Sequence, residues 1–231
     1  MEAGDYARRI DAFLIEREKS MLSKLIAIGG AAEGESFEVQ VKVRIEDPAP
    51  ILAALNSPET EILYHRHYHE YDHYFLFADP SQGRVRYRED EYLDENDQVT
   101  NVRYRLTLIG EARERRFDSD ALLSRSRYLA SATHSLRFYR EYFKPAEEIF
   151  IEKHRQRWRI LFQGTEFYIN LDRLDQPDLG YFVEVKSRTW SRHDAEHKAG
   201  VATTLLSFLG VSSEERVIQD YAELIDPQQA P

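Results

Sequence analysis

The stretch from residue 37 to 45, FEVQVKVRI, alternates strictly between apolar and polar side chains. Successive side chains of a strand face opposite sides of a sheet, so this period of two predicts a β-strand with one apolar and one polar face. The polar face carries charges of both signs, on Glu38, Lys42 and Arg44. Taken alone, such a strand is typical of a half-exposed antiparallel sheet. Its meaning depends on whether other strands repeat the pattern.

Other segments repeat this alternation and are expected to be strands: 62–77, 84–88, 101–110, 148–163, 166–174 and 181–188. On the polar faces of the expected strands, basic side chains outnumber acidic ones. The basic residues are Lys42, Arg44, Arg84, Arg86, Arg88, Arg103, Arg105, Arg155, Arg157, Lys186 and Arg188, and the acidic residues are Glu38, Asp172 and Glu184.

This basic excess runs against the composition of the chain, which has a formal net charge of -10 over 231 residues. If the polar faces were merely solvated, we would expect the acidic bias there as well. Closing the strands into a barrel would turn the apolar faces outward under helices and the cations inward. Because unpaired buried charges are costly and arginine forks match phosphate oxygens, the pattern predicts an antiparallel barrel around a polyanionic, phosphorylated ligand.

The remaining segments predict an α+β fold in which helices pack outside the barrel. Helical spacing is expected at 5–28, after Pro48, and at 118–143, 194–209 and 213–225, while 89–97 is expected to be an acidic hairpin loop. We expect residues 1–34 to form a helical extension, a candidate for homodimer contact or a lid, and residues 35–231 to form the barrel domain.

The composition excludes cysteine chemistry and favours one cellular location. The chain has no cysteine, so thiolate metal sites and cysteine nucleophiles are impossible, and a reducing cytoplasm is the expected location. No signal peptide is legible, and no apolar stretch is long enough to cross a membrane. The negative net charge argues against general binding of nucleic acid or anionic membranes, so an anion site must be local.

A row of histidines lies on one face of the expected strand 62–77: His65, His67, His69 and His73. The row could bind a metal ion, or it could be an exposed or packed strand face. The second interpretation is favoured, because neighbouring histidines on one strand seldom converge on one ion without carboxylates from elsewhere.

The sequence E-x-Q-x-K at residues 38–42 resembles the E-x-E-x-K signature of the CYTH, or triphosphate tunnel metalloenzyme, family. Further similar motifs follow in order: D-x-Y-F at 72–75, V-R-Y-R at 85–88, RLTL at 105–108, Arg155 ahead of Trp158, LD at 171–172, LGYFVEV at 179–185 and DYAELI at 220–225. The resemblance covers roughly residues 36 to 226 and leaves out the N-terminal helix.

The resemblance implies a closed, eight-stranded antiparallel tunnel that holds a triphosphate and Mg²⁺ or Mn²⁺. Members include thiamine triphosphatases, inorganic triphosphatases, class IV adenylate cyclases and RNA 5′-triphosphatases. It implies metal ligation by Glu38 and Glu184, assisted by Asp172, with Lys42, Glu38 and Glu184 as the candidate catalytic residues. Lys42 could be a phosphate clamp or a general base. The full set of candidate ligand-binding residues is Lys42, Arg86, Arg88, Arg105, Arg155, Arg157 and Lys186.

The chain departs from the family pattern at several positions, among them Arg113-Glu114-Arg115, where the acid of an Arg-x-Glu pattern is out of register. Gln40 stands where the family has its second glutamate, Lys186 replaces the second glutamate of the closing E-x-E, and Ile109 replaces a lysine. An ammonium at Lys186 could take the charge role of one metal ion, by pairing with Glu38, Glu184 or the ligand. It cannot generate hydroxide as a metal does.

Two hypotheses therefore remain. The chain could be an enzyme that hydrolyses or cyclises a triphosphate with a divalent metal, or a binding protein that retains a phosphate-rich anion without turnover. The expected ligands are of the tripolyphosphate, ATP and thiamine triphosphate class.

Overall fold

A computed structural model describes residues 37–109, 122–123, 127–189, 192–212, 216–217 and 219–225. For a few of these, including Glu38, only the backbone is described. The chain divides into two compact units, Met1–Ser36 and Phe37–Pro231. The helix predicted at 5–28 lies outside the described residues, so its dimer or lid role and the predicted domain boundary stay predictions.

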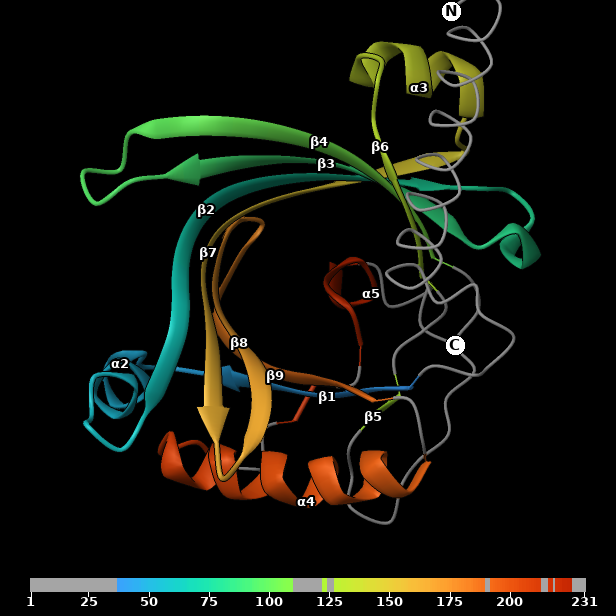
Figure 1. The fold of residues 1–231 in the computed structure, drawn as a ribbon. Coiled ribbons are helices and arrows are strands. Elements are labelled where there is room, and N and C mark those ends of the chain that lie inside the picture. Colours follow the sequence, from blue (N-terminus) through green and yellow to red (C-terminus); the bar gives the residue numbers. More distant parts are fainter. Residues whose placement is uncertain are drawn as a thin grey trace, which may run out of the picture. The chain divides into compact units, whose positions relative to one another are not determined.

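The second unit is built on one antiparallel sheet with the strand order β5-β1-β9-β8-β7-β2-β3-β4-β6. The strands are β1 (Phe37–Ile45), β2 (Glu61–Leu76), β3 (Arg84–Leu93), β4 (Val99–Ile109), β5 (Leu122–Leu123), β6 (Arg127–Ser131), β7 (Glu147–Phe162), β8 (Thr165–Gln176) and β9 (Asp178–Thr189). Figure 1 shows that the sheet is strongly curved.

The sheet confirms the α+β, antiparallel architecture but not a closed eight-stranded barrel. It has nine strands, and no hydrogen-bonded pairing joins its end strands β5 and β6 in the described part of the chain. β5 pairs with Val39 and Gln40 of β1. The segment at Arg216–Val217 also lies along β1, because the Val217 amide donates to the Lys42 carbonyl.

Local sequence fixes the longest hairpin. β7 and β8 join through Gln163 and Gly164, whose φ angles are 49° and 72°. Two successive residues with positive φ make the type of two-residue turn that matches strand twist, and glycine adopts this conformation without strain. The turn sets the register Phe162↔Thr165, which carries Arg157 opposite Asn170.

The outer apolar face of β1, β9, β8 and β7 packs against α4 (Arg192–Phe208) and α2 (Ala49–Leu55). Val41 and Val185 from the sheet and Ala199 and Leu205 from α4 belong to this core. The small alanines let the helix approach closely, and Gly210, with φ of 72°, follows the helix end. The expectation of apolar faces under helices is confirmed here.

Two further α-helices lie within the described residues of this unit. α3 (Leu136–Phe143) places Tyr139 against Phe75, Val85 and Tyr87 on the outer side of β2 and β3. α5 (Tyr221–Ile225) lies on the concave side of the sheet (Figure 1). It packs Tyr221 and Ala222 against an inner apolar layer of Tyr74, Leu76, Ile109, Ile149, Ile151, Leu174 and Phe182.

The prediction of a single helix over 118–143 is wrong in the middle of that range. Arg127–Ser131 is β6, which pairs with Arg105–Ile109 of β4. This pairing satisfies backbone groups that β4 would otherwise expose at an edge, and it outweighs helical periodicity. The helix begins only at Leu136, after Ser135, whose hydroxyl accepts from the Phe138 amide.

Two other boundaries also differ. The acidic segment expected as a loop from 89 continues as strand to Leu93, and the turn begins at Asp94, whose carboxylate accepts from the amides of Asn96 and Gln98. Among the described residues of the helix expected at 213–225, only Tyr221–Ile225 are helical, and Arg216 bridges to Val43 of β1 instead.

The histidine row packs as the strand-face interpretation expects. The His65 ring stacks on Trp158 at 4.6 Å between centroids, and the His69 ring stacks on His154 at 4.2 Å. His69 Nε2 lies 2.9 Å from Glu152 Oε1. Among the described residues, no group of three histidines or carboxylates has an arrangement that could hold a metal ion.

None of the helices in the described ranges combines the length and apolar character needed to cross a bilayer.

Candidate functional site

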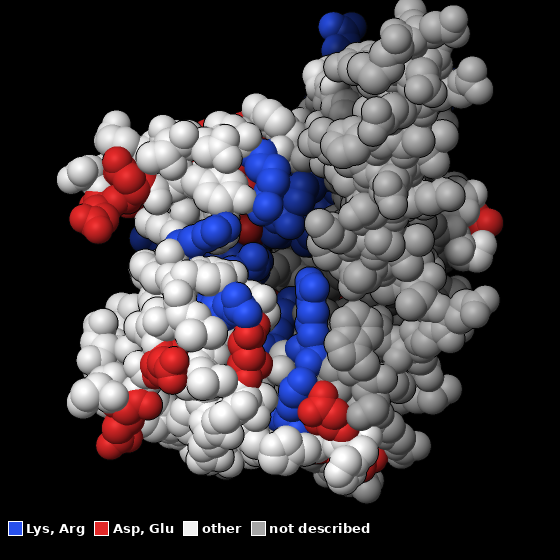
Figure 2. All heavy atoms as spheres, viewed as in Figure 1, with Lys and Arg blue, Asp and Glu red and all other residues white. Residues whose placement is uncertain are grey.

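A cavity of about 230 Å³ lies where the inner polar faces of the strands converge. Its lining includes every candidate ligand-binding residue: Lys42, Arg86, Arg88, Arg105, Arg155, Arg157 and Lys186. Arg188, Asn170, Tyr168 and Glu184 also line it. Figure 2 shows lysine and arginine side chains gathered around a hollow in this face of the molecule. Strand alternation thus brings together cations that are far apart in the sequence.

Neighbouring strands place four polar residues in one row across the cavity wall. Lys42 of β1 lies opposite Glu184 of β9, Glu184 lies opposite Asn170 of β8, and Asn170 lies opposite Arg157 of β7. Arg157 Nε donates to Asn170 Oδ1 at 2.7 Å, and Asn170 Nδ2 donates to Glu184 Oε2 at 2.9 Å. The amide therefore links the guanidinium to the carboxylate and fixes both side chains.

Three carboxylates share the inner face with these cations, and the comparison of basic and acidic residues from sequence omitted them. Glu70, Asp72 and Asp90 are each exposed by no more than 1%. Asp72 accepts from Nε and Nη2 of Arg88 and from Lys153 Nζ, the last at 2.6 Å. The signal was available, because alternation in 62–77 places Glu70 and Asp72 opposite the histidines.

The inner face is therefore partly neutralised by the protein itself. Glu70 Oε2 lies 2.9 Å from both Arg88 Nη1 and Lys153 Nζ. Asp90 takes the guanidinium of Arg105, with an Nη2 to Oδ2 distance of 2.7 Å. The expectation that the cationic interior needs an external anion was too strong, because buried carboxylates pair with several of its cations.

The pKa values of these carboxyl groups reflect the pairing. Burial alone would raise the pKa of Asp72, but the charges of Arg88 and Lys153 outweigh burial and hold it well below the usual range. The pKa of Glu70 is likewise lowered, because Arg155, Arg88 and Lys153 outweigh its burial. Both groups are thus ionised members of a buried network.

Asp172 belongs to a second buried network. Its carboxylate accepts two hydrogen bonds from Arg155 and one, at 2.6 Å, from the Tyr221 hydroxyl. Burial and the negative charge of Asp172 raise the pKa of Tyr221 well above its usual value. Arg84 donates to Asp220 and Glu223 beside α5, so the helix is held in the concave side by ion pairs as well as by apolar packing.

The basic residues that line the first cavity differ in their ion-pair and hydrogen-bond partners. Arg88 and Arg155 direct their guanidinium groups to buried carboxylates. Arg157 and Arg188 pair with no carboxylate within the part of the chain that the structure describes. Arg86 donates to Thr107 Oγ1 at 3.3 Å, and its Nε is 3.7 Å from Asp72 Oδ1, too far for a hydrogen bond.

Two buried donors at the cavity are also left over. Nε of Arg86 and Nε of Arg105 have no hydrogen-bond partner in the described structure. A buried N–H without a partner is costly to the fold. Lys42 Nζ donates to the Gln219 carbonyl at 2.9 Å and lies 4.3 Å from the centroid of the Tyr221 ring.

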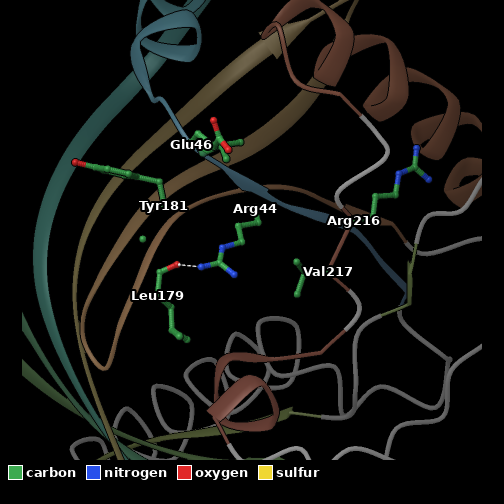
Figure 3. Close-up of a pocket in the computed structure, with 8 residues that line it drawn as sticks. Arg44, Glu46, Leu179, Tyr181, Arg216 and Val217 are labelled. Atoms are coloured by element: carbon green, nitrogen blue, oxygen red, sulfur yellow. Dashed lines mark hydrogen bonds between the residues drawn. The ribbon is translucent and has the colours of Figure 1, made fainter.

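A second cavity, of about 570 Å³, lies between the end of β1, the start of β9 and Arg216–Val217 (Figure 3). Arg44, assigned from sequence to the basic inner face, lines this cavity. Its Nη2 donates to the Leu179 carbonyl at 2.9 Å (Figure 3). Leu179, Ile45 and Val217 contribute apolar lining. Fewer cations converge here than in the first cavity, which is the better candidate for a polyanion.

Of the three predicted metal ligands, the two whose side chains are described, Asp172 and Glu184, are already engaged by other groups. Asp172 directs both carboxylate oxygens to Arg155 and Tyr221. Glu184 Oε2 accepts from Asn170 and lies 3.1 Å from Lys186 Nζ. Glu38 is on β1 opposite Arg188, but its side chain is outside the described residues. Hard divalent ions need several oxygen ligands, and the described carboxylates are already engaged by cations and hydrogen-bond donors.

Comparison with known proteins identifies the fold. No protein-family model and no curated protein matches the chain. The PH1819 protein of Pyrococcus horikoshii OT3 is 18% identical, over 83% of this chain and 99% of that chain, with a TM-score of 0.58. A proposed adenylate cyclase from Vibrio parahaemolyticus is 16% identical, over 84% and 99%, with a TM-score of 0.57.

A proposed adenylyl cyclase from Hippeastrum, HpAC1, for which a dominant triphosphatase activity is described, is 15% identical over 84% of this chain and 96% of that chain. Its TM-score is 0.51. At such identities the likeness concerns the fold. The chain shares the fold of these three structures, while its sequence motifs resemble those of the CYTH, or triphosphate tunnel, family.

We predict that Arg88 and Arg157 differ sharply in their effect on stability. Arg88→Met removes a guanidinium that pairs with both Asp72 and Glu70, so the free energy of unfolding should fall by about 3–5 kcal/mol. Arg157→Met removes one hydrogen bond to Asn170, so the loss should stay within about 1 kcal/mol. Urea unfolding followed by circular dichroism measures both values. Equal losses in the two variants would contradict the division of the cations into those paired with buried carboxylates and those without such a partner.

We also predict a loss of stability in acid that depends on Asp72. Its pKa is lower in the folded chain than the ordinary value of 3.8, so its contribution is present above pH 3.8 and is lost as the pH falls below that value. Between about pH 4 and pH 2, Asp72→Asn should reduce the slope of unfolding free energy against pH by up to about 1.4 kcal/mol per pH unit. Glu70→Gln is the second variant for this measurement. Unchanged slopes in both variants would show that these groups are not ionised partners in the fold.

Proposed function

We propose that the first cavity binds a phosphate-rich anion of the tripolyphosphate, ATP or thiamine triphosphate class. One observation carries the proposal. Arg157 and Arg86 reach the cavity from β7 and β3 without a hydrogen-bonded carboxylate, beside other cations that are already neutralised. Guanidinium groups present paired donors in a plane that match phosphate oxygens.

In this proposal the cations have separate tasks. Arg157, Arg86 and Arg188 donate hydrogen bonds to phosphate oxygens. Arg88, Arg155 and Arg105 are paired with carboxylates, and these pairs hold the strands of the cavity wall in place.

Lys42 acts as a phosphate clamp in this proposal. Its Nζ donates to a main-chain carbonyl and lies over the Tyr221 ring, and both contacts suit a charged ammonium. A general base must release its proton, so these contacts favour the clamp over the base.

Turnover is the second candidate function. It would use Lys42, Glu38 and Glu184 as catalytic residues, and Glu38, Glu184 and Asp172 as ligands of Mg²⁺ or Mn²⁺. The described donor set does not fit such an ion, so binding without turnover is the function we favour. A closed tunnel, a cytoplasmic location and a homodimer formed through residues 5–28 stay predictions.

Binding is tested by titrating tripolyphosphate into the protein in an isothermal calorimeter. We expect 1:1 binding that weakens as salt is added, because charge attraction is screened. Arg157→Met and Arg86→Met should each weaken the affinity by about 10-fold to 100-fold, since each removes hydrogen bonds between charged groups.

Arg173→Met is the matched control for these variants. Arg173 is also an arginine of the sheet, on β8, but its side chain is 59% exposed and pairs with Asp175 away from the cavity. Its affinity should equal that of the wild type. The proposal is wrong if the wild type does not bind tripolyphosphate, or if all three variants bind it equally well.

Turnover is tested by measuring phosphate release from tripolyphosphate, ATP and thiamine triphosphate with Mg²⁺ or Mn²⁺. We expect no release above the no-protein rate, and no pyrophosphate or cyclic nucleotide from ATP. Release that needs the metal and is lost in Glu38→Gln would establish the enzyme instead.

A further inference from the structure

We propose that Lys186 supplies the positive charge at Glu184, so that the cavity binds its phosphoanion free of divalent metal. This inference rests on the proposed function and specifies the chemical form of the ligand. It begins with two neighbouring inward positions of β9, at Glu184 and Lys186, which are separated by one residue and therefore lie on the same face.

The two side chains form a close ion pair in the cavity wall. Lys186 Nζ lies 3.1 Å from Glu184 Oε2, and the side chains are 15% and 6% exposed. The same oxygen accepts a hydrogen bond from Asn170 Nδ2 at 2.9 Å. An ammonium and an amide thus already engage one carboxylate oxygen of Glu184.

Three other carboxylates of the inner face are engaged by cations as well. Asp172 is engaged by Arg155 and Tyr221, Asp72 is engaged by Arg88 and Lys153, and Asp90 is engaged by Arg105. Mg²⁺ demands near-octahedral oxygen coordination and gives up its waters reluctantly. A dication would also lie close to the positive charges of Arg155, Arg157 and Lys186, which repel it.

The arrangement has a consequence for the ligand. A divalent ion that chelates a phosphate chain neutralises part of its charge and occupies oxygens that guanidinium groups would bind. A cavity wall that has its own cation, Lys186, next to Glu184 therefore binds the metal-free phosphate chain better than its complex with a divalent ion. Mg²⁺ should act as a competitor for the ligand and not as a cofactor of the site.

The test compares calorimetric titrations of tripolyphosphate in excess EDTA and in excess MgCl₂, at equal ionic strength. We expect binding in EDTA and affinity at least about 10-fold weaker in MgCl₂. Lys186→Glu places a second carboxylate beside Glu184, so affinity in EDTA should fall by about 10-fold to 100-fold and Mn²⁺ should recover part of it. Electron paramagnetic resonance should detect Mn²⁺ binding to Lys186→Glu without tripolyphosphate, and none to the wild type.

Lys186→Met is the second variant, in case Lys186→Glu fails to fold. It should bind tripolyphosphate more weakly in EDTA than the wild type and gain nothing from Mn²⁺, whereas Arg173→Met should match the wild type. Wild-type binding that requires Mg²⁺ or Mn²⁺ would overturn this inference and leave the proposed function intact. No binding of tripolyphosphate in either buffer would instead overturn the proposed function.

Discussion

The buried ion pairs of Asp72 with Arg88 and Lys153 are the interaction on which the inner face of the sheet depends. Strand alternation directs charged side chains into the concave side, where water cannot solvate them fully. Lys153 and Asp72 are both fully buried. Charges in such a position are tolerated only when paired and hydrogen-bonded, and Asp72 meets this condition by joining β3 and β7 to β2.

This pairing separates two kinds of cation that look alike in the sequence. Arg88 and Arg155 line the cavity with their donors directed to carboxylates, while Arg157 and Arg86 are not hydrogen-bonded to a carboxylate. A polyanion site can be built this way without a large charge penalty in the empty fold, because the protein neutralises the cations it does not use. On the ligand side, Asn170 holds Arg157 in place, because it accepts a hydrogen bond from Arg157 and donates one to Glu184.

Much of the fold and part of the site could be predicted from sequence. The period of two places a residue on a face regardless of its distant partners, so the candidate ligand-binding residues did converge on one cavity. Pairing was harder to predict. Asp172 accepts hydrogen bonds from Arg155, 17 residues away, and from Tyr221, 49 residues away. No sequence motif reveals that these donors engage its oxygens. The strand at Arg127–Ser131 was also missed, because its local sequence has helical periodicity. Its pairing with β4, which is distant in sequence, outweighs that periodicity.

The most direct measurement of the central claim is a crystal structure of the protein grown with tripolyphosphate in EDTA. The account predicts phosphate oxygens on the guanidinium groups of Arg157 and Arg86, with the hydrogen bonds from Arg88 to Asp72 and from Arg155 to Asp172 unbroken. Tripolyphosphate bound to Arg88 or Arg155 with those pairs broken, or bound beside Arg44 in the second cavity, would contradict it.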